Sequence, residues 1–396
     1  MIKSVIKDLA ARALKAVLSV FKLFPIKDNR VFFQSYSGTQ YSCNPKYISE
    51  ALEKEAENYE LIWAFTKPWD HAELESRGIR VVKYESIPYW YYRLTARVTV
   101  NNVNYRNYTP ARKGQYEIQT WHGGGFYKKT MADDKEVMKD RLAYERTMRD
   151  FDRYSLMMAS SQINLLKTIR GALCFKGKVL KGTPKDDVLV NGVGDGINKK
   201  VRDYLGVSDD VKIALYAPTW RQDAQKSDFD VDYEAVNEAL TDRFGGEWVM
   251  LRRLHHFAAK FFDEDSSAYI KAESYPEMQE LLGVVDVLIS DYSSSIWDFS
   301  FTGKPCFLFC SDLKKYTEDR DFYEPIETWG FPVTENNAEL ISAINKFDEE
   351  DYKNEIEKMH AMSKAFEEGH ATRDVCDIIR SVVYGTGEIP EGIPLA

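Results

Sequence analysis

The chain has 396 residues, of which 44% are hydrophobic and 29% are charged, and its formal net charge is -9 at pH 7. This composition excludes wholesale disorder, and the length predicts two domains of ordinary size. The acidic balance argues against a general nucleic-acid-binding protein, because no excess of basic residues is available to neutralise a phosphate backbone. The five scattered cysteines are typical of reduced thiols in a cytoplasmic protein.

The first 24 residues predict a cationic amphipathic helix that ends at Pro25. Most apolar side chains from Ile2 to Phe24 share one face, and lysines and arginines point to the other. The segregation is imperfect, because Leu14, Leu18 and Phe21 fall off the apolar face. Lys15 and Lys22 interrupt any apolar run long enough to span a bilayer or to form a signal-peptide core. We expect this helix to lie on an anionic membrane surface. A helix docked on the protein's own core is the alternative.

From Arg30 onward, short apolar runs alternate with amphipathic segments, as in parallel sheets covered by helices. The alternation restarts near residue 212, after a polar stretch over 198–210. The segment NGVGDGIN (191–198) lacks the full dinucleotide fingerprint and is interpreted as a linker turn. The predicted strands are 31–36, 60–65, 80–84, 97–102, 116–121, 155–160, 178–183, 212–219, 247–254, 267–273, 284–290 and 306–310, with helices over 45–56 and 138–150.

This pattern predicts an α/β fold in which two Rossmann-like domains face a cleft. The amphipathic helix is expected to occupy residues 1–28, the first domain 29–205 and the second domain 206–386. A loosely ordered tail is expected over 387–396.

The stretch DVLISDYSSSIWDFSFTGKP (286–305) predicts a buried strand, a polar turn and a helix closed by glycine. Asp291 ends the strand, and Ser293 and Ser294 supply hydroxyls and backbone N–H groups where the helix starts. A helix N-terminus at the carboxyl end of a parallel strand can bind phosphate. A serine that only caps the helix explains the same residues.

The stretch TWHGGGFYKKT (120–130) places His122 on a glycine-rich loop at the end of a predicted strand. Glycines such as Gly123 let a substrate approach the backbone closely, and Lys128 adds positive charge. Histidine has an unperturbed pKa suited to proton transfer near neutrality. His122 is therefore a candidate general base, and a structural histidine is the alternative.

Three further motifs follow predicted strands. KGTPKDDVL (181–189) is a charged turn, LYAPTWRQD (215–223) is a corner that offers an arginine to phosphate, and LRRLHHF (251–257) groups arginines with histidines. Two arginines beside two histidines favour anion binding over a place in the core. The candidate binding residues from these motifs are Lys185, Asp187, Thr219, Arg221, Arg253 and His255.

Together these motifs resemble the CDP-glycerol glycerophosphotransferases, which build teichoic acids and related polyol-phosphate polymers in Gram-positive bacteria. The resemblance runs from about Val31 to Arg373 and includes FFQSYSGTQYSCNPKYISEAL (32–52), WHGGGFYKK, GTPKDD, YAPTWR, RLH and the block from 275 to 309, followed by Asp312, Tyr316 and Arg320. The chain departs from the family pattern at Gly124, Gly125, Lys185 and His256. These departures leave the expected chemistry intact, and we expect them to alter the acceptor contacts and the loop shape.

The resemblance implies a GT-B architecture, with an N-terminal acceptor domain and a C-terminal nucleotide-donor domain. The donor would be CDP-glycerol, and glycerol phosphate would pass to an acceptor hydroxyl while CMP leaves. His122 would act as the base. His255, also a catalytic candidate, would balance phosphate charge with Arg253, Ser293, Ser294 and Arg221, and Arg320 adds a phosphate contact from the family's DxxxYxxxR pattern.

No cofactor is expected, and no carboxylate cluster has clear metal spacing, so metal-independent chemistry is predicted. Asp291 and Asp298 lie near the serines, and Asp298 is expected to contact ribose or serine hydroxyls, or only to complement the helix dipole. A lipid-linked acceptor would place the enzyme peripherally on the cytoplasmic face of the membrane.

Three alternatives stay open: a CDP-ribitol donor, a sugar-nucleotide glycosyltransferase of the same fold, and a non-catalytic membrane-bound scaffold. The acceptor, the number of units added and the oligomeric state, including a homo-oligomer, are also open.

Overall fold

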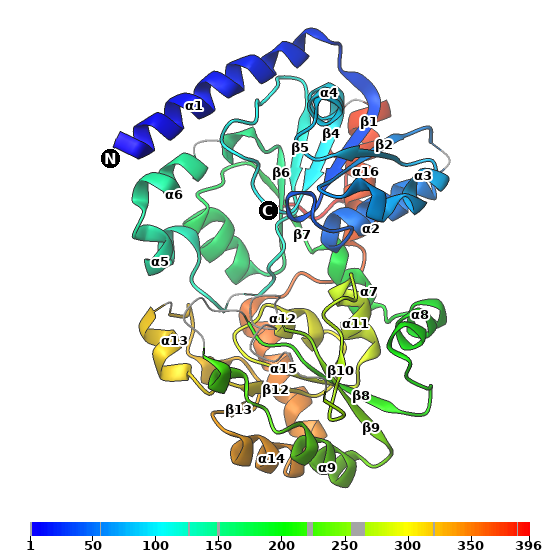
Figure 1. Cartoon of the computed structure of the whole chain (residues 1–396), viewed down its shortest axis with the longest axis vertical. Coiled ribbons are helices and arrows are strands. Elements are labelled where there is room, and N and C mark those ends of the chain that lie inside the picture. Colours follow the sequence, from blue (N-terminus) through cyan, green and yellow to red (C-terminus); the bar gives the residue numbers. More distant parts are fainter. Residues whose placement is uncertain are drawn as a thin grey trace.

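The computed structural model describes residues 2–55, 57–125, 127–148, 151–219, 225–254, 266–319, 321–385 and 387–396. Its strands form two parallel sheets, one in each of two stacked lobes (Figure 1). Among the described residues, the first sheet has seven strands in the order β3-β2-β1-β4-β5-β6-β7, and the second has six in the order β10-β9-β8-β11-β12-β13. The predicted α/β fold with two parallel sheets is confirmed.

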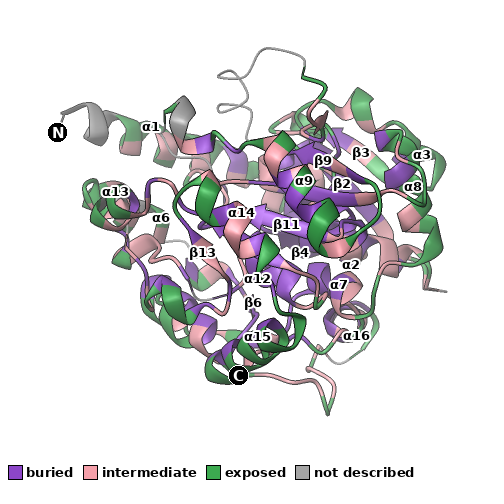
Figure 2. Ribbon diagram, turned by 90° about the horizontal axis from the view of Figure 1, so that it is seen from below, coloured by how far each residue is buried: buried purple, intermediate pink, exposed green. Residues whose placement is uncertain are grey.

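The first sheet is built from β1 (Lys27–Gln34), β2 (Glu60–Phe65), β3 (Arg80–Lys83), β4 (Ala96–Asn101), β5 (Tyr116–Gln119), β6 (Leu156–Ala159) and β7 (Lys178–Lys181). The second contains β8 (Lys212–Tyr216), β9 (Trp248–Arg252), β10 (Ile270–Lys271), β11 (Val287–Ser290), β12 (Cys306–Phe309) and β13 (Val333–Thr334). The short β13 was not predicted. The central strands are buried along most of their length (Figure 2), as expected of parallel strands covered on both faces.

Helices in the first half are α1 (Ile2–Leu18), α2 (Cys43–Glu53), α3 (Glu73–Ser76), α4 (Ile87–Thr95), α5 (Lys135–Met138), α6 (Arg141–Met148), α7 (Asp187–Val190) and α8 (Asp195–Leu205). Those in the second half are α9 (Tyr233–Phe244), α11 (Met278–Val284), α12 (Ser295–Ser300), α13 (Leu313–Asp319), α14 (Asn337–Asn345), α15 (Glu349–Ser363) and α16 (Ala371–Tyr384). Residues 164–172 form a π-helical segment.

Helix α8 corrects the interpretation of 191–210 as a linker turn followed by a polar stretch. Ile197, Val201 and Leu205 follow one another at intervals of four residues; the first is half-buried and the other two are buried. Gly206 ends the helix with φ of 68°. That apolar spacing is helical, and the surrounding lysines and aspartates obscured it.

The last helix, α16, returns to the first lobe (Figure 1). Its buried face, which includes Val375 and Ile379, shares a hydrophobic cluster with Val31 and Val98 of the first sheet. The tail, expected to be loosely ordered, instead runs beside β7, where Ala396 N–H donates to the Val179 carbonyl. The chain thus crosses between the lobes twice, so the cleft lies between two parts joined by more than one connection.

Candidate active site

Two cavities lined by described residues meet at His122. The larger, of about 640 Å³, lies between the two sheets and takes its walls from both lobes. The smaller, of about 210 Å³, lies behind the glycine loop at 123–125. His122 and Ser294 line both cavities, so a group held between these two residues is open to ligands from either side.

The imidazole of His122 is held in a defined tautomer. Its Nδ1 lies 2.9 Å from the backbone carbonyl of Asn102, which can only accept, so the proton is on Nδ1 and Nε2 carries the lone pair. The rings of Tyr36 and Trp121 flank it, with centroids 5.5 and 5.1 Å away. Burial lowers the pKa of His122, so the ring is neutral at neutral pH and available as a base.

The glycine loop after His122 packs directly on the second lobe. A Cβ on Gly124 would lie 2.5 Å from Trp297 Cδ1, and one on Gly125 would lie 2.9 Å from Tyr127. Tyr127 belongs to the hydrophobic core of the second lobe, and its carbonyl accepts from Tyr323 N–H. The side of the glycine loop away from His122 therefore packs on the second lobe.

Ser293 and Ser294 lie at the start of α12 and line the larger cavity. The Ser293 hydroxyl oxygen accepts from the Ser295 hydroxyl at 2.8 Å, while Ser294 has no side-chain capping bond to the helix. Arg253, at the end of β9, lines the same cavity while its Nη1 donates to the carbonyls of Ala272 and Tyr275. These side chains give the second-lobe wall of the larger cavity its hydrogen-bond donors.

Lys185 links the two walls. Its ammonium is buried, and its Nζ lies 2.9 Å from Asp186 Oδ1 and 2.5 Å from Oδ2 of Asp298, in the other lobe. Asp298 also accepts from Gln279, and burial together with the nearby Asp186 charge raises its pKa to about 7. Lys185 and Asp298 both line the cleft, with the lysine charge directed at carboxylates.

Asp187, Thr219 and Asp291 lie outside both cavities, and Lys128 lies in only one of them. Asp187 caps α16, because its carboxylate accepts from Ala371 and Thr372 N–H groups. Asp291 is buried and accepts from Thr219 N–H at 2.8 Å, which ties the turn after β8 to the end of β11. Lys128 lines only the smaller cavity, beside Gly123. The predicted Arg221, His255 and Arg320 lie outside the described residues.

The loop after β1 carries part of the family resemblance, but no site residue was predicted in it, and it forms a further wall of the cleft. Tyr36, Thr39 and Gln40 line the larger cavity on the side of the first lobe. The local signal for a wall here is the turn chemistry of SYSGTQYS (35–42), in which small and polar residues follow a buried strand directly.

Neither a metal cluster nor a membrane-spanning helix emerges from the described ranges. No group of three or more His, Cys, Asp and Glu side chains among these residues is arranged to hold a metal ion. No described helix combines the length and the apolar character needed to cross a bilayer.

Residues 16–381 match the family described as "CDP-Glycerol:Poly(glycerophosphate) glycerophosphotransferase". The "Teichoic acid glycerol-phosphate transferase" of Staphylococcus aureus is 27% identical, over 96% of this chain and 100% of the relative. The "Teichoic acid poly(glycerol phosphate) polymerase" of Bacillus subtilis is 28% identical over 87% of this chain. This chain spans 47% of the length of that polymerase.

Solved structures show the same fold. The wall teichoic acid polymerase TagF superposes with a TM-score of 0.80 at 26% identity, over 96% of each chain. A UDP-GlcNAc 2-epimerase from Methanocaldococcus jannaschii superposes with a TM-score of 0.53 at 15% identity, over 90% of this chain and all of the epimerase. The likeness to the epimerase concerns the fold alone. The predicted GT-B-like architecture is confirmed.

Proposed function

The chain belongs to the CDP-glycerol:poly(glycerophosphate) glycerophosphotransferase family, and we propose that it transfers glycerol phosphate from CDP-glycerol to a hydroxyl group of a lipid-linked acceptor. CMP is the second product. The observation that carries this proposal is the position of His122, a neutral imidazole with a fixed tautomer at the junction of two cavities. A TagF variant was solved after soaking with CDPG, which agrees with a CDP-activated donor.

In the proposed reaction, the acceptor hydroxyl enters the smaller cavity and Nε2 of His122 removes its proton. The acceptor oxygen forms a bond to the phosphorus nearer the glycerol, and the bond from that phosphorus to the bridging oxygen breaks. The electron pair leaves with CMP. Ser293, Ser294 and Arg253 stabilise the charge that builds on the transferred phosphate and on the leaving group.

His255, Arg221 and Arg320 keep their predicted roles as partners of the donor phosphates. Asp187, Thr219 and Asp291 act indirectly in this proposal, because their described contacts hold the backbone around the cleft. Lys185 and Asp298 hold the two walls at a fixed separation through their buried ion pair.

The test is a donor panel. The protein is incubated with CDP-glycerol, CDP-ribitol or a UDP-sugar and an acceptor lipid analogue, and CMP, UMP and UDP are measured by mass spectrometry. We expect CMP from CDP-glycerol and an acceptor heavier by one glycerol phosphate. Preferred use of CDP-ribitol would show instead that the enzyme transfers ribitol phosphate. UDP without CMP would replace it with glycosyl transfer, and no product from any donor would favour the scaffold.

We also propose that α1 holds the protein on an anionic membrane surface. Leu9, Val17 and Val20 are 60%, 67% and 52% exposed, whereas Leu18 is buried against the first lobe. The helix therefore docks through one edge and leaves the predicted apolar face uncovered along the outside of the molecule (Figure 1).

Val17→Asp should reduce sedimentation with anionic liposomes, because it places a negative charge on the face that meets the lipid. Met362→Asp is the matched control, since Met362 is also exposed but lies on α15. Equal binding of both variants would refute the anchor.

A further inference from the structure

The loop after β1 is held in a backbone conformation that side chains rarely adopt. Tyr36, Ser37 and Gly38 have φ angles of 43°, 57° and 79°, three consecutive residues in the left-handed region. Glycine accepts such angles freely, but tyrosine and serine do not. Strained segments persist where the surrounding structure fixes them, and they cluster at functional sites.

The surrounding structure does fix this loop. Asn102 Oδ1 accepts from Tyr36 N–H at 2.8 Å, and Asn102 Nδ2 donates to the Ser35 hydroxyl at 3.1 Å. Gly38 N–H donates to the Ser35 carbonyl, and Thr66 N–H donates to the Gly38 carbonyl. A Cβ on Gly38 would lie 3.0 Å from the Ala64 carbonyl oxygen, so the loop packs tightly against β2. Its position relative to the cleft is therefore set in advance.

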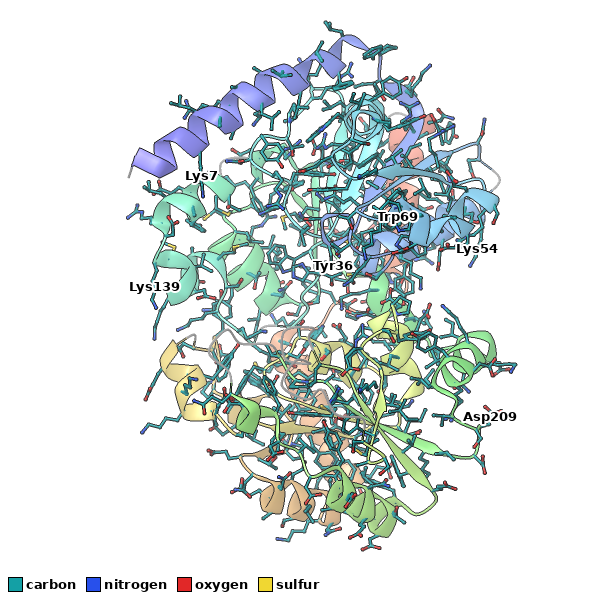
Figure 3. The ribbon with its side chains drawn as sticks, in the orientation of Figure 1. Lys7, Tyr36, Lys54, Trp69, Lys139 and Asp209 are labelled. Atoms are coloured by element: carbon teal, nitrogen blue, oxygen red, sulfur yellow. The ribbon has the colours of Figure 1, made fainter. Side chains whose placement is uncertain are left out.

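This loop forms part of the first-lobe wall of the larger cavity. Tyr36, Thr39 and Gln40 line the same space as Ser293 and Ser294 of the second lobe. Figure 3 shows Tyr36 at the boundary between the two lobes. The Tyr36 ring also meets the His122 ring edge-on, with centroids 5.5 Å apart.

The reaction geometry identifies the donor group that meets this wall. In-line displacement places the attacking oxygen and the leaving oxygen on opposite sides of the phosphorus. The third ester oxygen, which carries the polyol, must then project sideways from that line. With the attacking oxygen near His122 and the nucleotide on the second lobe, Tyr36, Thr39 and Gln40 form a side wall that this polyol can reach in the same cavity.

The polar groups of this wall suit a short chain of hydroxyls. Thr39 Oγ1 donates to the Tyr36 carbonyl at 2.8 Å, which leaves its lone pairs to accept. Gln40 Oε1 accepts from the Ser42 hydroxyl at 2.9 Å, which orients the amide so that its N–H groups can donate. A polyol hydroxyl both donates and accepts, and the Tyr36 ring offers an apolar surface to its C–H groups.

We propose that the loop at 35–40 binds the polyol of the donor through Thr39 and Gln40 and selects a three-carbon over a five-carbon polyol. This inference rests on the proposed function. Because the backbone is locked, the wall offers its hydroxyl and amide at one fixed depth in the cleft, and we expect this to favour the shorter polyol.

The experiment compares binding of CDP-glycerol and of CMP, without acceptor, in the full chain and in the double variant Thr39→Ala/Gln40→Ala. Both side chains are exposed, so their truncation leaves the core intact. We expect the Kd for CDP-glycerol to rise about tenfold and the Kd for CMP to stay unchanged. In turnover, KM for CDP-glycerol should rise with kcat unchanged, and the preference over CDP-ribitol should fall about tenfold.

Thr241→Ala is the matched control. Thr241 is an exposed threonine whose hydroxyl also donates to a backbone carbonyl, but it lies on α9, away from the cleft. Unchanged CDP-glycerol binding in the double variant, or an equal loss for CDP-glycerol and CMP, would overturn the polyol assignment alone. Wild-type protein that binds neither compound would overturn the proposed function as well.

Discussion

The two walls of the cleft are built in different ways. On the second lobe, Ser293 and Ser294 follow β11 within one strand–turn–helix unit, and Arg253 directly follows β9. On the first lobe, separate loops after β1, β4 and β5 supply Tyr36, Asn102 and His122, and hydrogen bonds gather them. The second wall thus follows from local structure, whereas the first depends on contacts between segments distant in sequence.

This contrast predicts that the chemistry is concentrated on the first wall. His122→Ala should lower the rate of CMP release by about 10²–10⁴-fold, because the acceptor hydroxyl then loses its base. The measurement is initial-rate CMP release with saturating CDP-glycerol. His370→Ala is the control, since His370 lies at the start of α16, outside both cavities. Unchanged turnover in His122→Ala would remove the assigned base.

The walls are also coupled through Lys185, and its loss should be the most damaging change to stability. Lys185→Met leaves the buried carboxylates of Asp186 and Asp298 uncompensated, at a cost of about 3–5 kcal/mol in the free energy of unfolding. Asp298→Asn added to Lys185→Met should recover part of that loss in urea denaturation. If the second change only adds to the damage, the ion pair is not what joins the lobes.

The contact of the glycine loop with the second lobe should show a smaller effect. Gly124→Ala places a Cβ 2.5 Å from Trp297 Cδ1 and should cost about 1–3 kcal/mol by overpacking. Gly123→Ala is the matched control, because the nearest atom to its Cβ is 3.7 Å away. We expect a lower melting temperature for Gly124→Ala than for Gly123→Ala. Equal melting temperatures would show that the two walls do not pack tightly at Gly124.

The same contrast explains what could be predicted from the sequence. The strands and the serine turn were predictable, because alternating apolar runs and a strand–turn–helix pattern are local signals. His122 was found through its glycines. The roles of Lys185 and Asp187 were not predictable, because their partners Asp298, Ala371 and Thr372 are more than a hundred residues away. The loop around Tyr36 was quoted only as part of the family resemblance, and no site residue was predicted in it, because no residue type in it carries obvious chemistry.

The smallest predicted effect is on the pH dependence of kcat/KM, which distinguishes a titrating group on the first wall from one on the second. Burial lowers the pKa of His122 below its ordinary value of about 6.5, so the base loses its proton at lower pH. Activity should therefore fall only in acid, and kcat/KM at pH of about 6.5 should exceed half of its plateau.

On the second wall, Asp298 has a pKa raised to about 7 by burial and by the Asp186 charge. If the fall of kcat/KM in acid is centred near pH of about 7 and disappears in Asp298→Asn, the titrating group is therefore Asp298 on the second wall. If the fall is instead centred below pH of about 6.5 and persists in Asp298→Asn, the titrating group is His122. This is the result expected if the first wall, which is built from loops distant in sequence, removes the proton.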